Sequence, residues 1–219
     1  MLVGLLSGLF LSQPVAKGQA RQRWSFGPRV GVNLSNVTST NNFFATSEGI
    51  YIGQNTVAPG LSAGLGALYS HSDRFGLGFD VLFSQRGYRG NVAVLANTVA
   101  VTQRLNYLEV PVTFRYFLTR SGSFRPNLYA GPVLSALISA VSYDSRTDLR
   151  IRNNGDFRPF ELGLTAGGQL NFKLGERRRL TLDGRYTYGL TNVQTVGANT
   201  HNQFVTIGLG YNFGVGPLY

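Results

Sequence analysis

The chain has 219 residues, with 28 glycines, 15 phenylalanines, 11 tyrosines and no cysteine, a composition that fits an aromatic-rich all-β protein better than a helical one. The absence of cysteine excludes a disulfide framework, a zinc knuckle and a thiol nucleophile. The formal net charge of +10, taken alone, would suggest nucleic acid or an anionic membrane surface as partner. The positions of the charged residues must distinguish between these two partners.

The first twenty residues resemble an export signal. An apolar stretch, LVGLLSGLFL, is followed by Pro14 and by a short polar segment ending Gly18-Gln19-Ala20, which is small at the two positions that a signal peptidase reads. We predict a signal peptide at residues 1–20 with cleavage after Ala20, although no Lys or Arg precedes the apolar stretch. No later segment approaches the ~18 apolar residues of a membrane-spanning helix.

The mature chain, residues 21–219, contains eight segments in which apolar residues alternate with small or polar ones, as in a strand with two different faces. In chain order they are residues 24–35, 61–70, 75–86, 106–118, 128–140, 160–173, 180–190 and 205–213. Each has ~9 to 11 residues or more, enough to cross a bilayer as a tilted strand. In the fourth segment Val112 and Phe114 share one face, and Glu109 and Arg115 share the other.

The connections between these segments alternate in length. Three are short (71–74, 119–126 and 174–179), and four are long (36–60, 87–104, 141–158 and 191–203). Short periplasmic turns and longer external loops are typical of outer-membrane barrels. The pattern therefore predicts an all-β fold, an eight-stranded antiparallel up-and-down transmembrane β-barrel in the cell outer membrane, which we expect to be a monomer.

The positive charge is concentrated in the short turns, at Arg74, Arg120, Arg125 and residues 177–179. An even number of strands puts these turns and both chain ends on the periplasmic side, where the arginines would lie beside phospholipid headgroups. Lipid is thus a better partner than nucleic acid, although simple solvated turn residues would have the same composition.

The non-apolar faces must point into the lumen, because a sheet can cross a bilayer only if it closes on itself. An eight-stranded barrel encloses a space that side chains just fill, and unpaired buried charges are very costly. We therefore predict an ionic network that stabilises the barrel rather than an open channel. Its predicted members are Arg29, Asp80, Arg86, Glu109, Arg115, Glu161, Lys173, Asp183 and Arg185.

The last segment reads Thr206-x-Gly208-x-x-Tyr211-x-Phe213. It resembles the C-terminal signal through which barrel-assembly machinery recognises its substrates, which makes that machinery an expected partner. The usual signal ends at its aromatic residue, whereas six residues follow Phe213 here.

Four stretches, LNYLEVPVTFRYFL, NLYAGPVLSALISA, FELGLTAGGQLNFKL and LTLDGRYTYGLTNV, together resemble the outer-membrane β-barrel domain of the PorT-like family. The similarity extends over essentially the whole mature chain, and its motifs are strand patterns that carry no chemistry. It implies a Gram-negative outer-membrane barrel of this size and, since one member is tied to type IX protein secretion, a link to secretion components. Fold membership does not fix function.

The sequence offers little chemistry, and we predict no catalytic, cofactor-binding or metal site. His71 falls in a short turn. His201 falls in the last long connection, where it could in principle meet acids or a serine of the preceding loop. Those residues are Asp144, Ser145, Asp148 and Asp156. A lipid A-modifying barrel enzyme is therefore an alternative, without a supporting motif.

Two further alternatives follow from the same pattern. A soluble, lipocalin-like barrel would place the apolar faces inward around a ligand, and a narrow pore would conduct ions. Any specific activity is expected in the external loops. The loop at 141–158 carries four arginines among three aspartates and could bind lipopolysaccharide headgroups, and the first loop mixes amides with aromatic and apolar side chains at Asn41, Asn42, Phe43, Phe44, Tyr51 and Ile52.

Overall fold

The computed structural model describes residues 24–39, 43–46, 49–52, 56–94, 97–144, 149–195 and 199–215. The predicted signal peptide lies outside these ranges. The strands are β1 (Trp24–Ser39), β2 (Phe43–Thr46), β3 (Gly49–Ile52), β4 (Thr56–Ser70), β5 (Phe75–Val94), β6 (Asn97–Phe117), β7 (Asn127–Asp144), β8 (Arg150–Arg152), β9 (Phe160–Lys173), β10 (Arg178–Gly189) and β11 (Thr200–Val215), with a 3-10 helix, η1, at Asn154–Asp156. In the part of the chain so described, no helix is long and apolar enough to cross a membrane.

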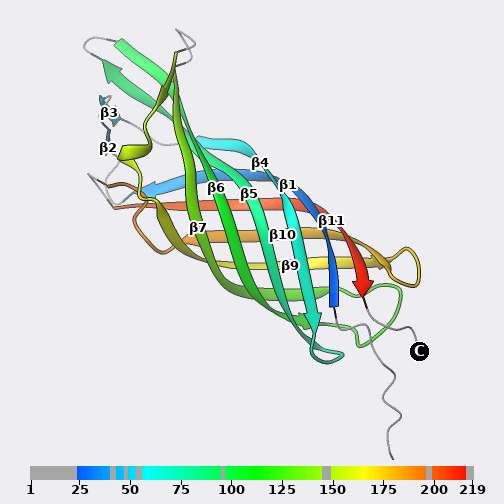
Figure 1. The fold of residues 1–219 in the computed structure, drawn as a ribbon. Coiled ribbons are helices and arrows are strands. Elements are labelled where there is room, and N and C mark those ends of the chain that lie inside the picture. Colours follow the sequence, from blue (N-terminus) through cyan, green and yellow to red (C-terminus); the bar gives the residue numbers. More distant parts are fainter. Residues whose placement is uncertain are drawn as a thin grey trace, which may run out of the picture.

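Eight of these strands close into an antiparallel barrel, which confirms the predicted fold (Figure 1). Each strand pairs with the next along the path β1, β4, β5, β6, β7, β9, β10 and β11. The first and last strands close the ring, from the Trp24–Val215 pair to the Ser39–Thr200 pair. Closure satisfies the backbone donors and acceptors of the strand edges, which a bilayer cannot do.

The two faces of the barrel wall differ as the alternation predicts. On β6, Val112 and Phe114 are 36% and 55% exposed on the outside, whereas Glu109 and Arg115 are each 2% exposed. The same division holds along the other barrel strands, with large apolar side chains such as Val30, Leu65 and Ile207 exposed. This orientation is opposite to the one that a lipocalin-like carrier requires.

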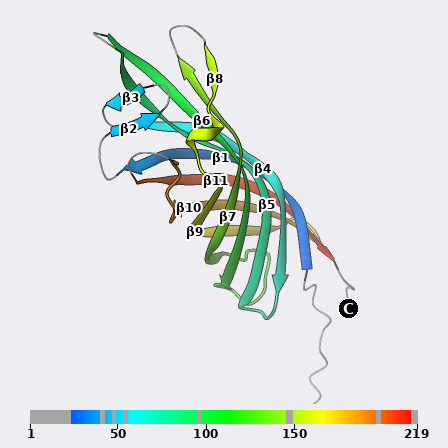
Figure 2. The same ribbon diagram turned by 60° about the vertical axis from the view of Figure 1, so that its left-hand side comes forward.

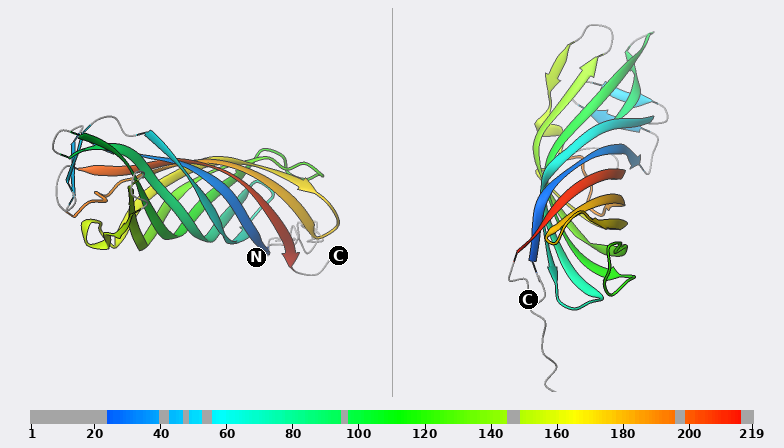
Figure 3. Two further views of the ribbon diagram at one scale, coloured as in Figure 1. Left: turned by 90° about the horizontal axis from the view of Figure 1, so that it is seen from above. Right: turned by 90° about the vertical axis from the view of Figure 1, so that its right-hand side faces the viewer.

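The two ends of the barrel are built differently. Residues 71–74, 118–126 and 174–177 make the short turns at one end, the turn end, where β1 begins and β11 finishes (Figure 3). The other end, the loop end, carries the small strands β2, β3 and β8 and the helix η1 (Figure 2). By the usual topology of outer-membrane barrels the turn end is periplasmic and the loop end external.

The prediction of a long loop at residues 87–104 is wrong, because most of this segment is strand. β5 runs on to Val94 and β6 begins at Asn97, and the two strands stay paired up to the Val94–Asn97 contact. A hairpin therefore projects well beyond the mouth of the barrel (Figure 1).

A second correction concerns the inner face of β7. The alternation predicts Ser139 inside, but the register between β6 and β7 shifts at Asn106 and Tyr107. Beyond that bulge Ser139 pairs with Asn106 and accepts a hydrogen bond from its side chain (2.8 Å), while Ala140 is fully buried. An extra residue in one strand reverses the faces of everything that follows it.

Aromatic side chains surround the turn end. Trp24 stacks on Phe26 with ring centroids 5.7 Å apart and lies 4.9 Å from Tyr69. Further pairs are Phe75–Phe114, Phe75–Tyr116, Phe124–Phe172 and Tyr211–Phe213. Girdles of this kind mark the membrane–water interface of outer-membrane barrels.

Candidate functional site

The lumen is the place where the sequence gathers its charges, and the structure brings eight of the nine predicted residues into it. Four bases and four acids line the interior: Arg29, Arg86, Arg115, Arg185, Asp80, Glu109, Glu161 and Asp183. Lys173 is exposed at the last position of β9, because the strand ends there and its side chain reaches water. Without Lys173 the inward charges balance.

Arg86 is the centre of the cluster nearer the loop end. Its Nε donates to Glu109 Oε1 (2.7 Å), its Nη1 to Glu161 Oε2 (3.1 Å) and its Nη2 to Ser135 Oγ (2.9 Å). Nη2 also contacts Glu109, so the guanidinium holds that carboxylate with two nitrogens. Because the partners come from β6, β7 and β9, one side chain of β5 ties together strands from across the barrel.

Two aromatic rings enclose the same guanidinium. The Arg86 carbon lies 4.6 Å from the ring centre of Tyr107 and 4.2 Å from that of Phe204, distances at which a cation is attracted to a ring face. Tyr107 lies two residues before Glu109 and so falls on the predicted inner face of the fourth segment. Phe204 was not predicted, because it lies just before the predicted start of the last segment. Its position opposite Thr187 and Ser35 in the paired strands follows from extending the alternation by one residue.

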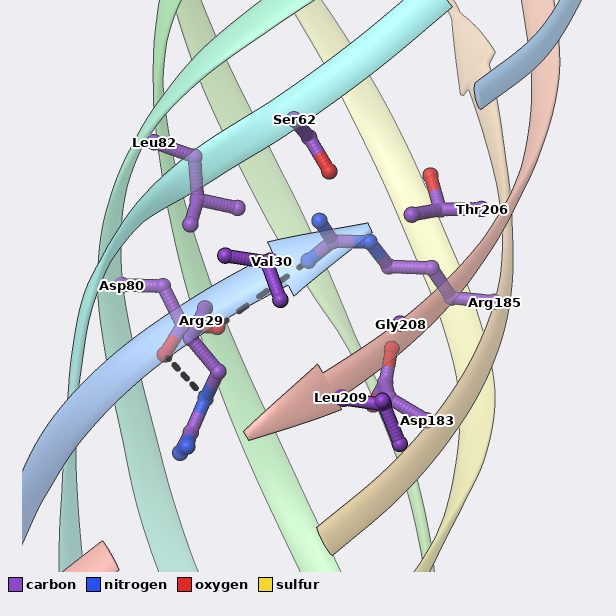
Figure 4. Close-up of a pocket in the computed structure, with 10 residues that line it drawn as sticks. All are labelled: Arg29, Val30, Ser62, Asp80, Leu82, Asp183, Arg185, Thr206, Gly208 and Leu209. Atoms are coloured by element: carbon purple, nitrogen blue, oxygen red, sulfur yellow. Dashed lines mark ion pairs between the residues drawn. The ribbon is translucent and has the colours of Figure 1, made fainter. Parts of the chain in front are cut away.

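A second cluster lies nearer the turn end (Figure 4). Asp80 is shared by Arg29 and Arg185, at 3.9 and 4.0 Å. The hydroxyl of Tyr129 donates to Asp183 (2.7 Å). Arg115 donates to Gln169 Oε1 (2.7 Å) and lies 4.7 Å from the Tyr129 ring centre. The cluster around Arg86 has one more acid than base, and the cluster around Asp80 has one more base than acid. The charges of the two clusters therefore compensate each other.

The space left between these side chains is small. A cavity of about 20 Å³ is bordered by Arg29, Asp80, Asp183 and Arg185, which is close to the minimum that holds one water molecule. The lumen at this level is therefore filled by side chains rather than open to ions.

Glycines in the wall make room for the charged groups. A Cβ on Gly66 would meet Asp80 Oδ1 and would come within 2.9 Å of Arg29 Nε. A Cβ on Gly78 would collide with Arg115 Nε. At Gly66 and Gly78 the missing side chain thus leaves space that an arginine side chain occupies.

The loop end is closed by two connections that fold into the mouth. Phe157 and Val193, 4% and 2% exposed, pack with Leu105, Tyr107 and Ala140 inside the barrel. The backbones are joined by Arg158 N to Val193 O (2.8 Å) and Thr195 N to Asp156 O (2.9 Å). The side chain of Asn153 exchanges hydrogen bonds with Gln103 of β6. The loops that hold Phe157 and Val193 also contain Leu149, Ile151 and Val196, so hydropathy alone does not single out the two plug residues.

Of the residues considered for catalysis, those that the structure describes are not assembled into such a site. His71 is exposed in the turn after β4. His201 belongs to β11 rather than to the preceding loop, which corrects its predicted place, and its Nδ1 lies 3.0 Å from the carbonyl oxygen of Gly189. Ser145 and Asp148 lie outside the described residues. Within the described ranges no three His, Asp or Glu side chains form a metal-binding group.

The residues of the predicted assembly signal lie on both faces of β11. Thr206 is buried and donates to Asn33 Oδ1 (2.8 Å), and Gly208 pairs with Gly31 and Asp183. Tyr211 and Phe213 point outward in the aromatic girdle, with ring centroids 4.7 Å apart.

Residues 12–194 match the family model described as the outer membrane protein beta-barrel domain. The chain belongs to this family. With its closed eight-stranded wall and apolar exterior, this chain is a small barrel of the outer membrane. No match to the sequence is found among curated proteins.

Solved structures with the same fold are distant in sequence. The outer membrane protein OprG from Pseudomonas aeruginosa is 17% identical, with a TM-score of 0.51, over 90% of this chain and 99% of that one. Neisserial surface protein A is 16% identical, with a TM-score of 0.49, over 90% and 99% of the two chains. The outer membrane protease OmpT from Escherichia coli is 7% identical, with a TM-score of 0.46, over 88% and 96%.

Proposed function

We propose that this outer-membrane barrel is a monomeric, non-enzymatic and non-conducting protein whose specific activity resides in its external loops, in a structural, adhesive or secretion-associated role. The observation that carries the proposal is the closed lumen. Arg86 joins Glu109 and Glu161 across the interior between two aromatic rings. Above it, Phe157 and Val193 fill the mouth.

These two barriers are independent. The arginine cluster uses buried ion pairs that are costly to break, and the plug uses apolar packing and backbone hydrogen bonds between loops. An ion entering from outside would have to displace both. His201 also supports the non-enzymatic role, because its ring stacks on Tyr188 with centroids 5.8 Å apart and its Nδ1 lies 3.0 Å from the carbonyl oxygen of Gly189.

Planar-bilayer recording tests the non-conducting role. We expect no stepwise conductance from the wild-type barrel, and none from the variant Phe157→Ala/Val193→Ala, because the Arg86 cluster still blocks the lumen below the plug. Heat-modifiable gel migration shows that both proteins are folded. Stepwise channels from the folded wild type would refute the proposal.

The secretion-associated role rests on the PorT-like resemblance of four strand segments, and its partners would be type IX secretion components. Deleting the gene in its own host should then lower the amount of secreted cargo in the culture medium, and a plasmid copy should restore it. Unchanged secretion in the deletion strain would leave only the structural or adhesive role.

Delivery to the membrane is proposed to use the barrel-assembly machinery through the last strand. Replacing the outward Phe213, 46% exposed, by Ala should slow appearance of the heat-modifiable form in cells while leaving refolding of the purified protein in detergent unchanged. Equal slowing in both settings would indicate a stability defect instead of lost recognition.

A further inference from the structure

The outer surface of the barrel changes character just beyond the hydrocarbon layer at the loop end. On β6 the last large apolar side chain exposed on the outside is Leu108, at 43%, and the next outward positions toward the loop end are Asn106 and Arg104. On β5 the corresponding sequence is Phe83, Gln85, Gly87 and Arg89. Four to six residues along a tilted strand correspond to a rise of roughly 10–15 Å, so these arginines lie at the level of lipid headgroups.

The strand register brings four arginines onto one face there. One cross-strand row contains Gly87, Arg104, Val141 and Arg152 on β5 to β8. The next row contains Arg89, Thr102, Tyr143 and Arg150. Residues opposite one another in antiparallel strands share a face, and all four arginines are exposed.

No carboxylate occupies these two rows. The acid that follows Tyr143 on β7, Asp144, pairs with Val101, and Val101 packs inward against Val37 and Tyr88. With strands ~4.8 Å apart and same-face neighbours ~7 Å apart, the four arginines cover an area of roughly 14 by 7 Å. Their charges are therefore not neutralised by acids in these rows.

One of the arginines is held in place. Arg150 Nε donates to the hydroxyl of Tyr143 (2.8 Å), and its guanidinium carbon lies 4.7 Å from the same ring centre. This arrangement fixes the guanidinium plane, which reduces the entropy lost when a ligand binds.

We propose that Arg89, Arg104, Arg150 and Arg152 form a binding site for the phosphorylated headgroup of a lipopolysaccharide molecule lying against the barrel wall. The inference rests on the proposed placement of the loop end outside the cell. The face points sideways, as Leu108 does, so the group beside it is the headgroup of a lipid whose chains contact the apolar band. Guanidinium groups bind phosphate with two nitrogens at once.

The site is tested with the purified full-length barrel in detergent, titrated with fluorescent diphosphoryl lipid A. The test variant is Arg104→Gln/Arg150→Gln/Arg152→Gln, and the control is Arg120→Gln/Arg177→Gln/Arg178→Gln, which removes the same charge from the turn end. An arginine at a membrane surface contributes about a fivefold change in affinity. We expect the test variant to bind on the order of a hundredfold more weakly and the control to bind like the wild type.

Dephosphorylated lipid A should bind the wild type as weakly as diphosphoryl lipid A binds the test variant. Equal binding of the two lipids by the wild type, equal losses in test and control variants, or no loss in the test variant would overturn the site. Heat-modifiable migration is measured for every protein, and Arg104→Lys/Arg150→Lys/Arg152→Lys, which keeps the charge, serves as a second folded variant with intermediate affinity. A silent bilayer recording with failed lipid binding would refute this site without affecting the proposed function.

Discussion

The replacement of Arg86 by Leu tests whether the ionic cluster stabilises the barrel. The substitution removes four hydrogen bonds, two to Glu109 and one each to Glu161 and Ser135, and two cation–π contacts. It also leaves two carboxylates buried without a cation. Removing one partner of a buried ion pair costs ~3–5 kcal/mol, and desolvated cation–π contacts add ~1–2 kcal/mol, so we expect a loss of at least about 4 kcal/mol.

Urea unfolding in phospholipid vesicles measures this loss, with fluorescence of Trp24, the chain's one tryptophan, as reporter. With a slope of about 2 kcal/mol per molar urea, the midpoint should fall by roughly 2 M. The variant Arg86→Leu/Glu109→Gln/Glu161→Gln removes all three charges and should regain more than half of the loss, because neither Glu109 nor Glu161 is then a buried carboxylate without its cation.

Arg120→Leu, an exposed turn substitution, is the matched control and should change stability by less than ~0.5 kcal/mol. The reasoning is refuted if Arg86→Leu stays within ~1 kcal/mol of the wild type, since that is below the cost of an unpaired buried ion. It is equally refuted if the charge-free triple variant is no more stable than the single one.

Four further substitutions test the account of the lumen. Gly78→Val would push the Arg115 side chain aside and should lower the urea midpoint, whereas Gly184→Ala, where an added Cβ meets nothing within 4 Å, should leave it unchanged; equal midpoints for both would contradict the account of the glycines. Lys173→Ala should be neutral in urea unfolding because its side chain is exposed. Tyr129→Phe removes the hydrogen bond to Asp183 and should cost about 1–3 kcal/mol; the reverse order of these two effects would place Lys173 in the network after all.

The face of the barrel wall that each residue occupies could be predicted from the sequence, because successive residues of a strand point to opposite faces. That rule alone predicts the inward positions of Glu109 and Arg115 and the outward positions of Val112 and Phe114. The rule fails at Ser139, because a bulge inserts one residue without any local sequence signal.

The ends of the strands were harder to predict than their faces. Residues 87–104 look like a polar loop if a strand is required to have an apolar, lipid-facing side. Beyond the membrane both faces of a strand meet water or protein, so the outward positions there become polar, as at Arg89 and Arg104. The sequence signal that could have revealed the hairpin is the set of β-branched residues on either side of residues 95–96: Val92, Val94, Val99 and Val101.

The plug and the aromatic enclosure of Arg86 depend on contacts between distant segments. Phe157 and Val193 lie in different loops, and their association is visible only when the loops are placed over the same mouth. Phe204 reaches Arg86 because β11 and β5 face each other across a narrow lumen. Neither relation leaves a periodic pattern in the sequence.

The balanced lumen also explains where the protein's net charge can act. The chain has twenty basic and ten acidic residues, and the buried set takes four of each. Sixteen basic and six acidic residues are left outside this set, so the whole excess of +10 lies outside the balanced lumen. Because an interior of mixed sign cannot attract an anion from a distance, a positive field is available only at the two rims of the barrel, where headgroup phosphates lie.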